Sequence, residues 1–160
     1  FAMHGALTIG PLDGANVEIR EAVGDDNFFL FGLTAPEVND LDRRGYAPRE
    51  YIERSPRLEE AIESIASGFF SPGDPARFRP LVDELRGADT YKHAADFDSY
   101  VAAHERVAAT YADPEEWARL VGHNLPHVGR FSSDRTIREY ARDIWGIEPC
   151  PIELSNEAHR

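Results

Sequence analysis

Short apolar runs alternate with turn residues in the first third of the chain. Ala6–Ile9 is such a run and predicts a buried strand, and a tight turn follows over residues 10–14. A helix is expected from an N-cap at Asn16 to about Val23. Phe28–Phe31 predicts a second strand, because an uninterrupted apolar run suits a strand buried on both faces of a parallel sheet. Strand, helix and strand together have the size of a βαβ unit.

The pattern that follows is mainly helical. Thr34–Glu37 has the form of a capping box, and the helix that it begins is expected to end near Arg44. Pro48 opens a short helical piece, and Ser55 with the proline after it begins a helix that should end at Gly68. The next helix is predicted from apolar positions that share one face, namely Phe78, Leu81, Val82 and Leu85.

Two longer helices are predicted in the second half of the chain. The first runs from Phe97 to Tyr111. Asp113 starts the second, because a proline and two glutamates follow this capping residue directly. Pro126 is expected to break that helix near Asn124 or Leu125, since proline lacks an N–H group and clashes with the preceding turn.

A last helix is expected after a cap at Ser133 or Asp134, with Gly146 at its end. Its apolar residues recur at helical spacing and are expected to face inward: Ile137, Tyr140, Ala141, Ile144 and Trp145. Residues 150–160 are expected to form an extended, mobile tail. The fold class is therefore α/β, mostly helical, with roughly six or seven helices and two or three short strands.

Composition narrows the classes of partner. The chain has 160 residues, which is the size of one globular domain. Its formal net charge of −12 argues against nucleic acid and against an anionic membrane surface, because both are bound by basic patches. No apolar run approaches the length of a membrane span. Cys150 is the single cysteine, so a reducing compartment such as the cytoplasm is expected.

The histidines are the first candidates for chemistry. His123 and His127 lie four residues apart, which on a continuous helix would place both imidazoles on one face and allow a zinc site. The expected break at Pro126 and the lack of a third ligand at fixed spacing argue against that site, so no metal ligand is predicted. His104 lies on an apolar stripe and is interpreted as a partly buried side chain.

Residues 132–135 combine two serines, an aspartate and an arginine at a predicted helix start. They suit either helix capping or a phosphate site, and capping is the preferred interpretation because caps are commoner. Asp13 is interpreted as a turn residue rather than a general acid. No Ser/His/Asp arrangement is supported by spacing, and no catalytic residue is predicted in this chain.

Three segments nevertheless resemble one enzyme family. They are Gly5-Ala6-Leu7-Thr8-Ile9-Gly10-x-Leu12-Asp13-Gly14-Ala15-Asn16-Val17-Glu18-Ile19, then Ser67 to Pro72, and then Gly129 to Tyr140. All three are similar to segments of the α-glucan phosphorylases, which act on glycogen, starch or maltodextrin. His4 stands where the family has asparagine, and Pro11 stands where it usually has threonine. The family also suggests a short strand within residues 89–95, before Ala95-Asp96-Phe97.

The resemblance implies a place within a larger enzyme. Residues 1–149 would form the C-terminal part of the second, cofactor-side lobe, which is Rossmann-like in the GT-B glycosyltransferase fold. The lysine that binds pyridoxal 5′-phosphate would lie immediately before Phe1, so no cofactor-binding residue is assigned here. His4 could act on that cofactor, but it more simply replaces an asparagine that bonds the backbone. An isolated 1–160 would leave strand edges uncovered at Ala6–Ile9 and Phe28–Phe31, and is expected to self-associate or to be marginally stable.

The implied reaction is phosphorolysis. Orthophosphate would cleave the terminal α-1,4 linkage of a glucan and release α-glucose 1-phosphate with retention, and the parent enzyme would be a cytoplasmic homodimer. Two alternatives stay open from the residues alone. One is a stand-alone, non-catalytic helical module that keeps the fold. The other is a metal-dependent hydrolase that uses His123 and His127.

Overall fold

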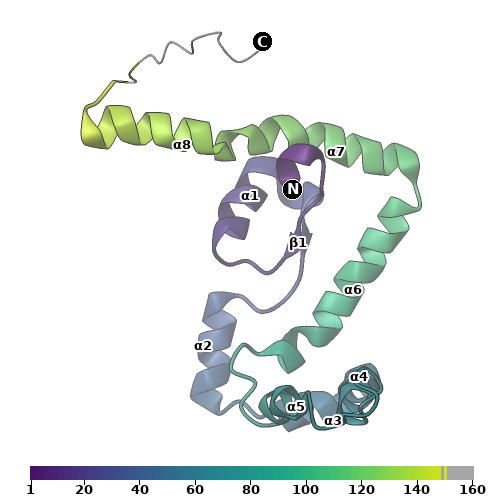
Figure 1. Ribbon diagram of the computed structural model, residues 1–160. Helices are drawn as coiled ribbons and strands as arrows, with labels where there is room; N and C mark the ends of the chain where they lie inside the picture. The colour runs from purple at the N-terminus through teal and green to yellow at the C-terminus, as the bar shows by residue number, and fades with distance from the viewer. Residues whose placement is uncertain (149, 151–160) are drawn as a thin grey trace, which may run out of the picture.

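The computed structural model describes residues 1–148 and residue 150. They form a two-stranded parallel sheet, β1 (Ile9–Gly10) and β2 (Phe29–Leu30), and eight α-helices (Figure 1). The α-helices are α1 (Ala15–Val23), α2 (Ala35–Arg44), α3 (Pro48–Arg54), α4 (Pro56–Ala66), α5 (Arg79–Arg86), α6 (His93–Tyr111), α7 (Pro114–Val128) and α8 (Ser133–Tyr140). Single turns of 3-10 helix are η1 (Ala2–His4), η2 (Asp25–Asn27) and η3 (Gly129–Phe131), and η4 (Ala141–Trp145) is a π-helix.

The predicted βαβ unit is present, with α1 joining two parallel strands. Ile9 lies opposite Phe29, and the first ladder bond runs from the Phe29 amide to the Thr8 carbonyl at 3.0 Å. The first strand therefore begins later than the predicted Ala6–Ile9. Among the described residues β1 pairs with β2 alone, and the first hydrogen bond of that pairing is the one to Thr8. In the second run Phe28 alone is buried and the next three residues are half-buried, so burial on both faces is not seen in this two-stranded sheet.

The prediction that Asn16 caps α1 is wrong. Gly14 is the N-cap and has φ of 48°, a conformation that glycine adopts without steric cost. The Asn16 side chain instead donates from Nδ2 to the Pro11 carbonyl at 3.0 Å and holds the turn closed. At the other end, the Gly24 amide donates to the Arg20 carbonyl at 2.8 Å, as expected for the residue that ends this helix.

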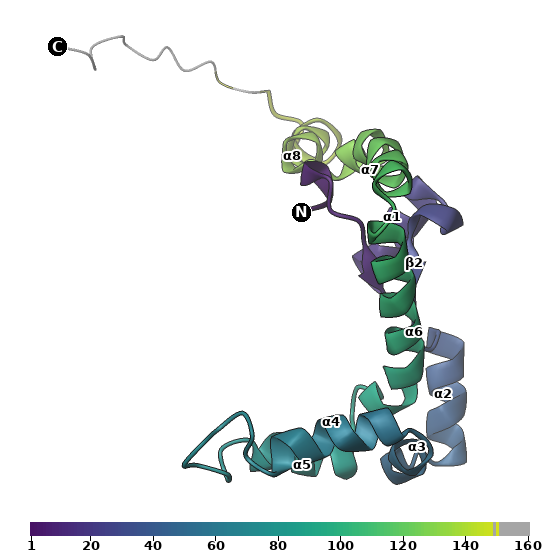
Figure 2. The same ribbon diagram turned by 90° about the vertical axis from the view of Figure 1, so that its right-hand side faces the viewer.

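The helices are arranged as an open frame. Figure 1 shows α7 and α8 in line, above α1 and the strands. Helix α6 runs from the N-terminal start of α7 to a second group of helices, which consists of α3, α4 and α5. Seen from the side, α2 lies next to α6 and the α4–α5 pair projects away from them (Figure 2). Two separate cores result. The first contains Ile52, Leu58, Ile62, Val82 and Ala94, and the second contains Val23, Phe28 and Val128.

Helix α6 starts earlier than predicted, at His93, and residues 89–95 form no strand. The cause is Asp89, whose side chain is buried and caps the helix. Its Oδ1 accepts from the His93 amide at 3.0 Å, and its Oδ2 accepts from the Ala94 amide at 2.7 Å. Tyr46 donates its hydroxyl to the same Oδ2 at 2.6 Å, and Lys92 turns the chain with φ of 62°.

Helix α7 continues through Pro126 to Val128, so the predicted break is wrong. Pro126 is exposed and has no N–H group to donate to the Gly122 carbonyl one turn earlier. The His127 ring supports the same turn, because its Nδ1 donates to the His123 carbonyl at 2.7 Å. Docking also holds α7 in place: Leu120, Asn124 and Val128 are buried, and Asn124 Nδ2 donates to the Asn27 carbonyl at 3.0 Å.

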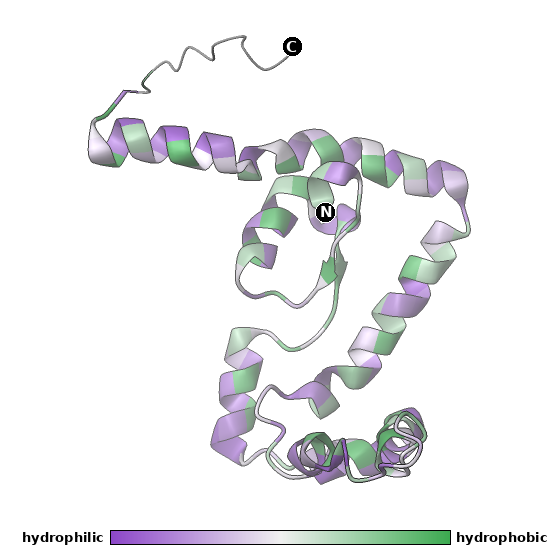
Figure 3. Ribbon diagram, viewed as in Figure 1, coloured by the Kyte–Doolittle hydropathy of each residue, from purple (hydrophilic) through white to green (hydrophobic). Residues whose placement is uncertain are grey.

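Helix α8 has Ser132 as its N-cap, not Ser133 or Asp134, and no side chain caps it. It continues into η4, and Gly146 ends the segment in the left-handed conformation. The expectation that its apolar residues face inward is wrong for this chain. Ile137, Tyr140, Ile144 and Trp145 are all exposed, Ile144 to 67%, and apolar positions recur along the helix in Figure 3. No other described element covers this face.

Most of the local signals are confirmed. Thr34 and Glu37 form the predicted capping box of α2, and Asp113 accepts from two amides at the start of α7. The prolines at 48, 56 and 114 each lie in the first turn of a helix. Helix α4 ends at Ala66, two residues before the predicted Gly68. Within the described residues, no helix is both long and apolar enough to cross a membrane.

Replacing Asp89 tests the cap of α6. We expect Asp89→Ala to lower the free energy of unfolding by about 3 kcal/mol, because it leaves the buried Ala94 amide, the partly buried His93 amide and the Tyr46 hydroxyl without an acceptor. Tyr46→Phe removes one of these bonds and should cost about 2 kcal/mol or less. Urea denaturation of the chain measures both. Equal stability of Asp89→Ala and wild type would contradict this role for the carboxylate.

Replacing Pro126 tests whether the proline strains α7. Pro126→Ala restores a backbone donor at an exposed position, so we expect the free energy of unfolding to rise by about 1–3 kcal/mol. Gly122→Ala is the matched control, because a Cβ there meets no atom within 4 Å. It should add about 1 kcal/mol through helix propensity alone. A smaller gain from Pro126→Ala than from Gly122→Ala would show that the helix carries no proline strain.

Candidate functional site

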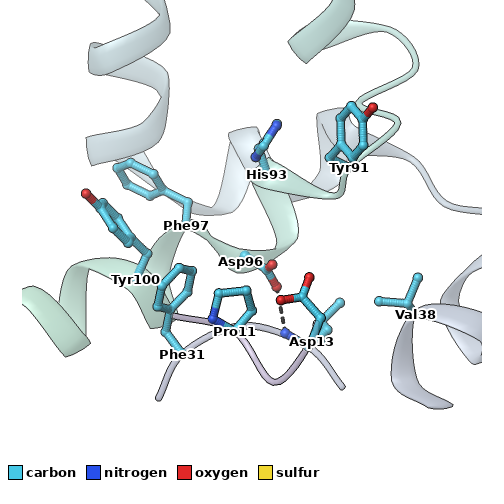
Figure 4. Close-up of a pocket in the computed structure, with 10 residues that line it drawn as sticks. Pro11, Asp13, Phe31, Val38, Tyr91, His93, Asp96, Phe97 and Tyr100 are labelled. Atoms are coloured by element: carbon cyan, nitrogen blue, oxygen red, sulfur yellow. Dashed lines mark hydrogen bonds between the residues drawn. The ribbon is translucent and has the colours of Figure 1, made fainter. Parts of the chain in front are cut away.

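A groove opens at the carboxyl ends of both strands (Figure 4). In parallel sheets this edge is where ligands bind, because the loops that leave the strands meet there. The groove has a volume of about 550 Å³, which is in the range of small-ligand sites. Its walls are formed by Pro11, Asp13, Phe31, Leu33, Val38, Tyr91, His93, Asp96, Phe97 and Tyr100.

The two strands place the first wall. Pro11 and Asp13 belong to the turn after β1, and this turn packs so closely on Asn16 that a Cβ at Gly10 would lie 2.5 Å from Asn16 Nδ2. A side chain at Gly10 would therefore displace the Asn16 amide that bonds to the Pro11 carbonyl. Phe31 and Leu33 follow β2 on the same edge.

Helix α6 forms the opposite wall of the groove and is hydrogen-bonded to the loop after β2. Asp96 Oδ1 accepts from the Leu33 amide at 2.8 Å, and Ser99 Oγ accepts from the Gly32 amide at 3.0 Å. Gly32 has φ of 81°, and a Cβ there would lie 2.9 Å from Asp96 Oδ2. These contacts set the distance between the helix and the loop, and thus the width of the groove.

The electrostatics of the groove are acidic. Figure 4 shows the carboxyl groups of Asp13 and Asp96 near one another. The pKa of Asp96 is raised, first because burial disfavours its charged form, and further by the charges of Asp89 and Asp13. The Leu33 amide and His93 act in the opposite direction. A carboxyl group with a raised pKa in a groove is typical of functional sites, although here it also has a structural bond.

Aromatic rings form the rest of the surface. Tyr100 lies edge-on to Phe31 with ring centroids 5.1 Å apart. Tyr91 is 79% exposed at the rim, and its ring centroid lies 5.9 Å from that of His93. Neither lysine nor arginine contributes to the walls of the groove among the described residues. The site therefore offers acceptors and ring faces, and His93 is the one basic side chain among the described lining residues, so an anion such as phosphate meets two carboxyl groups and a single imidazole.

Comparison with known proteins gives the family. The carbohydrate phosphorylase family model matches residues 1–147. Glycogen phosphorylase from Synechocystis is 56% identical over 156 residues, which cover 98% of this chain and 18% of that protein. The muscle glycogen phosphorylases of Oryctolagus cuniculus and Homo sapiens are 51% and 50% identical over 154 residues, with 96% of this chain and 18% of each relative covered.

The chain belongs to the carbohydrate phosphorylase family. It spans 18% of the length of these curated relatives, so the family match concerns one part of a larger enzyme. The resemblance found in the sequence is thereby confirmed. Within this phosphorylase chain, the groove is built from residues 11–38 and 91–100, which include the turn that carried the strongest resemblance.

His123 and His127 lie close together in the structure, and both rings are hydrogen-bonded to backbone carbonyls. Their rings stack with centroids 4.5 Å apart. His123 Nε2 bonds to the Val23 carbonyl at 2.9 Å, so it fastens α7 to the end of α1. Among the described residues, no cluster of three potential metal ligands exists. The pair has a structural role here, and no observation supports the metal-dependent hydrolase.

The other candidates lie apart from the groove, except for Asp13. Arg135 donates to Glu139 at 2.6 Å and to the Arg130 carbonyl at 3.2 Å, so its guanidinium is already paired within the described residues. His4 is exposed at the end of η1. His104 is exposed rather than partly buried, with its ring edge-on to Tyr100 at 4.6 Å. Asp13 does serve its turn, but it also lines the groove.

Sequence reasoning missed the groove wall from α6. The expected strand within residues 89–95 includes His93, and Asp96 follows it, so no helical face is predicted there. No local capping signal marks the start of α6, because Asp89 lies four positions before His93 and reaches the helix through the turn at Lys92.

Asp96→Asn tests the cause of the raised pKa. The amide oxygen can still accept from Leu33, but the buried charge is removed. Because the folded state holds the Asp96 proton more tightly than the unfolded state, wild type loses stability relative to the variant as pH rises through this range. We expect the variant's relative stability to be greater at about pH 7 than at about pH 3. Urea unfolding at both pH values measures the difference, and the opposite trend would contradict the burial argument.

Proposed function

We propose that this chain is the C-terminal part of a pyridoxal-phosphate-dependent α-1,4-glucan phosphorylase. The enzyme would transfer a glucosyl unit from a glucan end to orthophosphate and release α-glucose 1-phosphate with retention. The observation that carries this proposal is the identity of 50–56% to named glycogen phosphorylases over 96–98% of the chain. The part of the chain that matches the family model, residues 1–147, includes the strands, the groove and the last helix.

Residues 1–149 would complete the second, Rossmann-like lobe of a GT-B fold. Two strands that pair in parallel through a helix support this, since they are the repeating unit of such lobes. A sheet of two short strands is too small to be stable by itself, so further strands from the longer protein would pair beside them.

The exposed face of α8 and η4 supports the same view. Ile137, Ile144 and Trp145 form an apolar surface that a protein of this length would normally bury. We infer that the preceding part of the enzyme covers it. The strand edges at Ala6–Ile9 and Phe28–Phe31 are the other surfaces through which we expect an isolated 1–160 to self-associate.

The covalent cofactor site would lie outside this chain. Lys92 is its single lysine, and the side chain is only 12% exposed. Lys92 Nζ lies 3.0 Å from Asp42 and 4.8 Å from the centre of the Tyr46 ring. The Lys92 amine is therefore held by an ion pair and a cation–π contact, and it does not fit a Schiff-base site. The cofactor lysine is placed immediately before Phe1, and no catalytic residue is assigned among the described residues.

The partners of the parent enzyme follow from the proposed reaction. They are an α-1,4-glucan and orthophosphate, and the enzyme would work as a homodimer in the cytoplasm. The net charge of −12 and the lack of cationic residues in the groove imply that orthophosphate is bound by the part of the enzyme outside this chain.

An activity assay tests the proposal. The natural full-length protein that contains this chain should release glucose 1-phosphate from maltoheptaose and orthophosphate when loaded with pyridoxal phosphate. Residues 1–160 alone should release none, because the cofactor lysine and the phosphate site would be missing. Loading without any phosphorolysis by the full-length protein would favour the non-catalytic module, and activity of 1–160 alone would overturn the placement of the catalytic residues.

A further inference from the structure

The groove holds polar groups that the fold itself does not use. Among the described residues, the carboxyl group of Asp13 and the ring of His93 have no hydrogen-bond partner, and neither does Asp96 Oδ2. The hydroxyls of Tyr91 and Tyr100 are likewise unpaired within the described part of the chain. These five groups are open to solvent and are not used by the fold, so all of them are available to a polar ligand in a groove of about 550 Å³.

Charge decides which polar ligand is suitable. The walls carry two carboxyl groups and no lysine or arginine, so a phosphate group would be repelled at this edge of the sheet. Hydroxyl groups, by contrast, donate well to carboxylate oxygens, and each carboxylate can accept several such bonds. A neutral, hydroxyl-rich molecule therefore suits the groove better than an anion does.

The aromatic surface narrows the ligand further. Tyr91 is largely exposed at the rim, while Phe97 and Tyr100 belong to the wall formed by α6. Ring faces beside acceptor groups match a sugar ring, which has hydroxyls at its edge and C–H groups on its faces. An open groove, rather than a closed cavity, also admits a chain that continues beyond the site.

We propose that this groove is a subsite for the glucan chain, separate from the place where orthophosphate is bound. This inference rests on the proposed function, because that function supplies the glucan. In it, Asp13 and His93 bond to sugar hydroxyls, and Tyr91 packs against a ring face at the rim. Asp96 has a second role, since its Oδ1 holds the loop after β2 and leaves Oδ2 for the ligand.

The experiment uses the natural full-length protein with pyridoxal phosphate bound. Asp13→Ala and Tyr91→Ala change exposed groove residues, so both variants should fold. We expect the KM for maltoheptaose to rise about fivefold to tenfold in each, as for the loss of one hydrogen bond or ring contact. The KM for orthophosphate and kcat should stay within about twofold. Asp13→Asn and Tyr91→Phe keep an acceptor oxygen and a ring, and should raise the KM for maltoheptaose less than the alanine variants do.

Matched controls change the same residue types outside the groove. Asp134→Ala lies at the start of α8 and Tyr111→Ala lies at the end of α6, and both residues are exposed. Neither should change the KM for maltoheptaose. If the rest of the enzyme fills the groove instead, Asp13→Ala and Tyr91→Ala would lower the melting temperature and leave that KM unchanged, which would overturn the subsite.

Calorimetric titration with maltoheptaose, without orthophosphate, separates this inference from the proposed function. If wild type shows no phosphorolysis, the proposed function fails, and the titration still tests the groove. Weaker binding by Asp13→Ala and Tyr91→Ala than by the two controls would support the subsite. Equal binding by all four variants, or no binding by wild type, would overturn it, even in an enzyme that is active.

Discussion

The start of helix α6 is the constraint on which the rest of the structure depends. The buried Asp89 carboxylate caps this helix, and Asp96 one turn later bonds to the loop after β2. The same helix supplies Ala94 to one core, and further along Arg106 donates to the Leu30 carbonyl at 2.9 Å. Asp89 therefore fixes the start of α6 within the helical group, while Asp96 and Arg106 fasten the same helix to β2 and to the loop after it, which sets one wall of the groove.

The described residues form an open frame. Their sheet has two short strands, and the face of α8 and η4 is exposed. The proposal that this chain is one part of a longer enzyme accounts for both features, because further chain would cover these surfaces. The proposed separation of binding sites follows from charge. In the described part of the chain, the walls of the groove carry two carboxyl groups and neither lysine nor arginine, which suits glucan hydroxyls better than orthophosphate.

Local signals in the sequence predicted most of the fold. Capping residues and first-turn prolines mark α2, α3, α4 and α7, because these effects act within a few residues. The errors arose where distant contacts decide. Asp89 starts α6 with help from Tyr46, which lies 43 residues away, and α7 continues past Pro126 because Asn124 and Val128 are docked on other elements. The groove was not predictable in the same way, because its two walls come from segments about 80 residues apart in the chain.

The position of the cofactor lysine tests the central claim most directly. The natural full-length protein is loaded with pyridoxal phosphate, reduced with borohydride and digested, and the labelled peptide is identified by mass spectrometry. Our account predicts one stoichiometric adduct, on a lysine immediately before Phe1, and none on Lys92, which is held by Asp42 and Tyr46. An adduct on Lys92, or no specific adduct in a folded protein, would contradict the proposed place of this chain in a glucan phosphorylase.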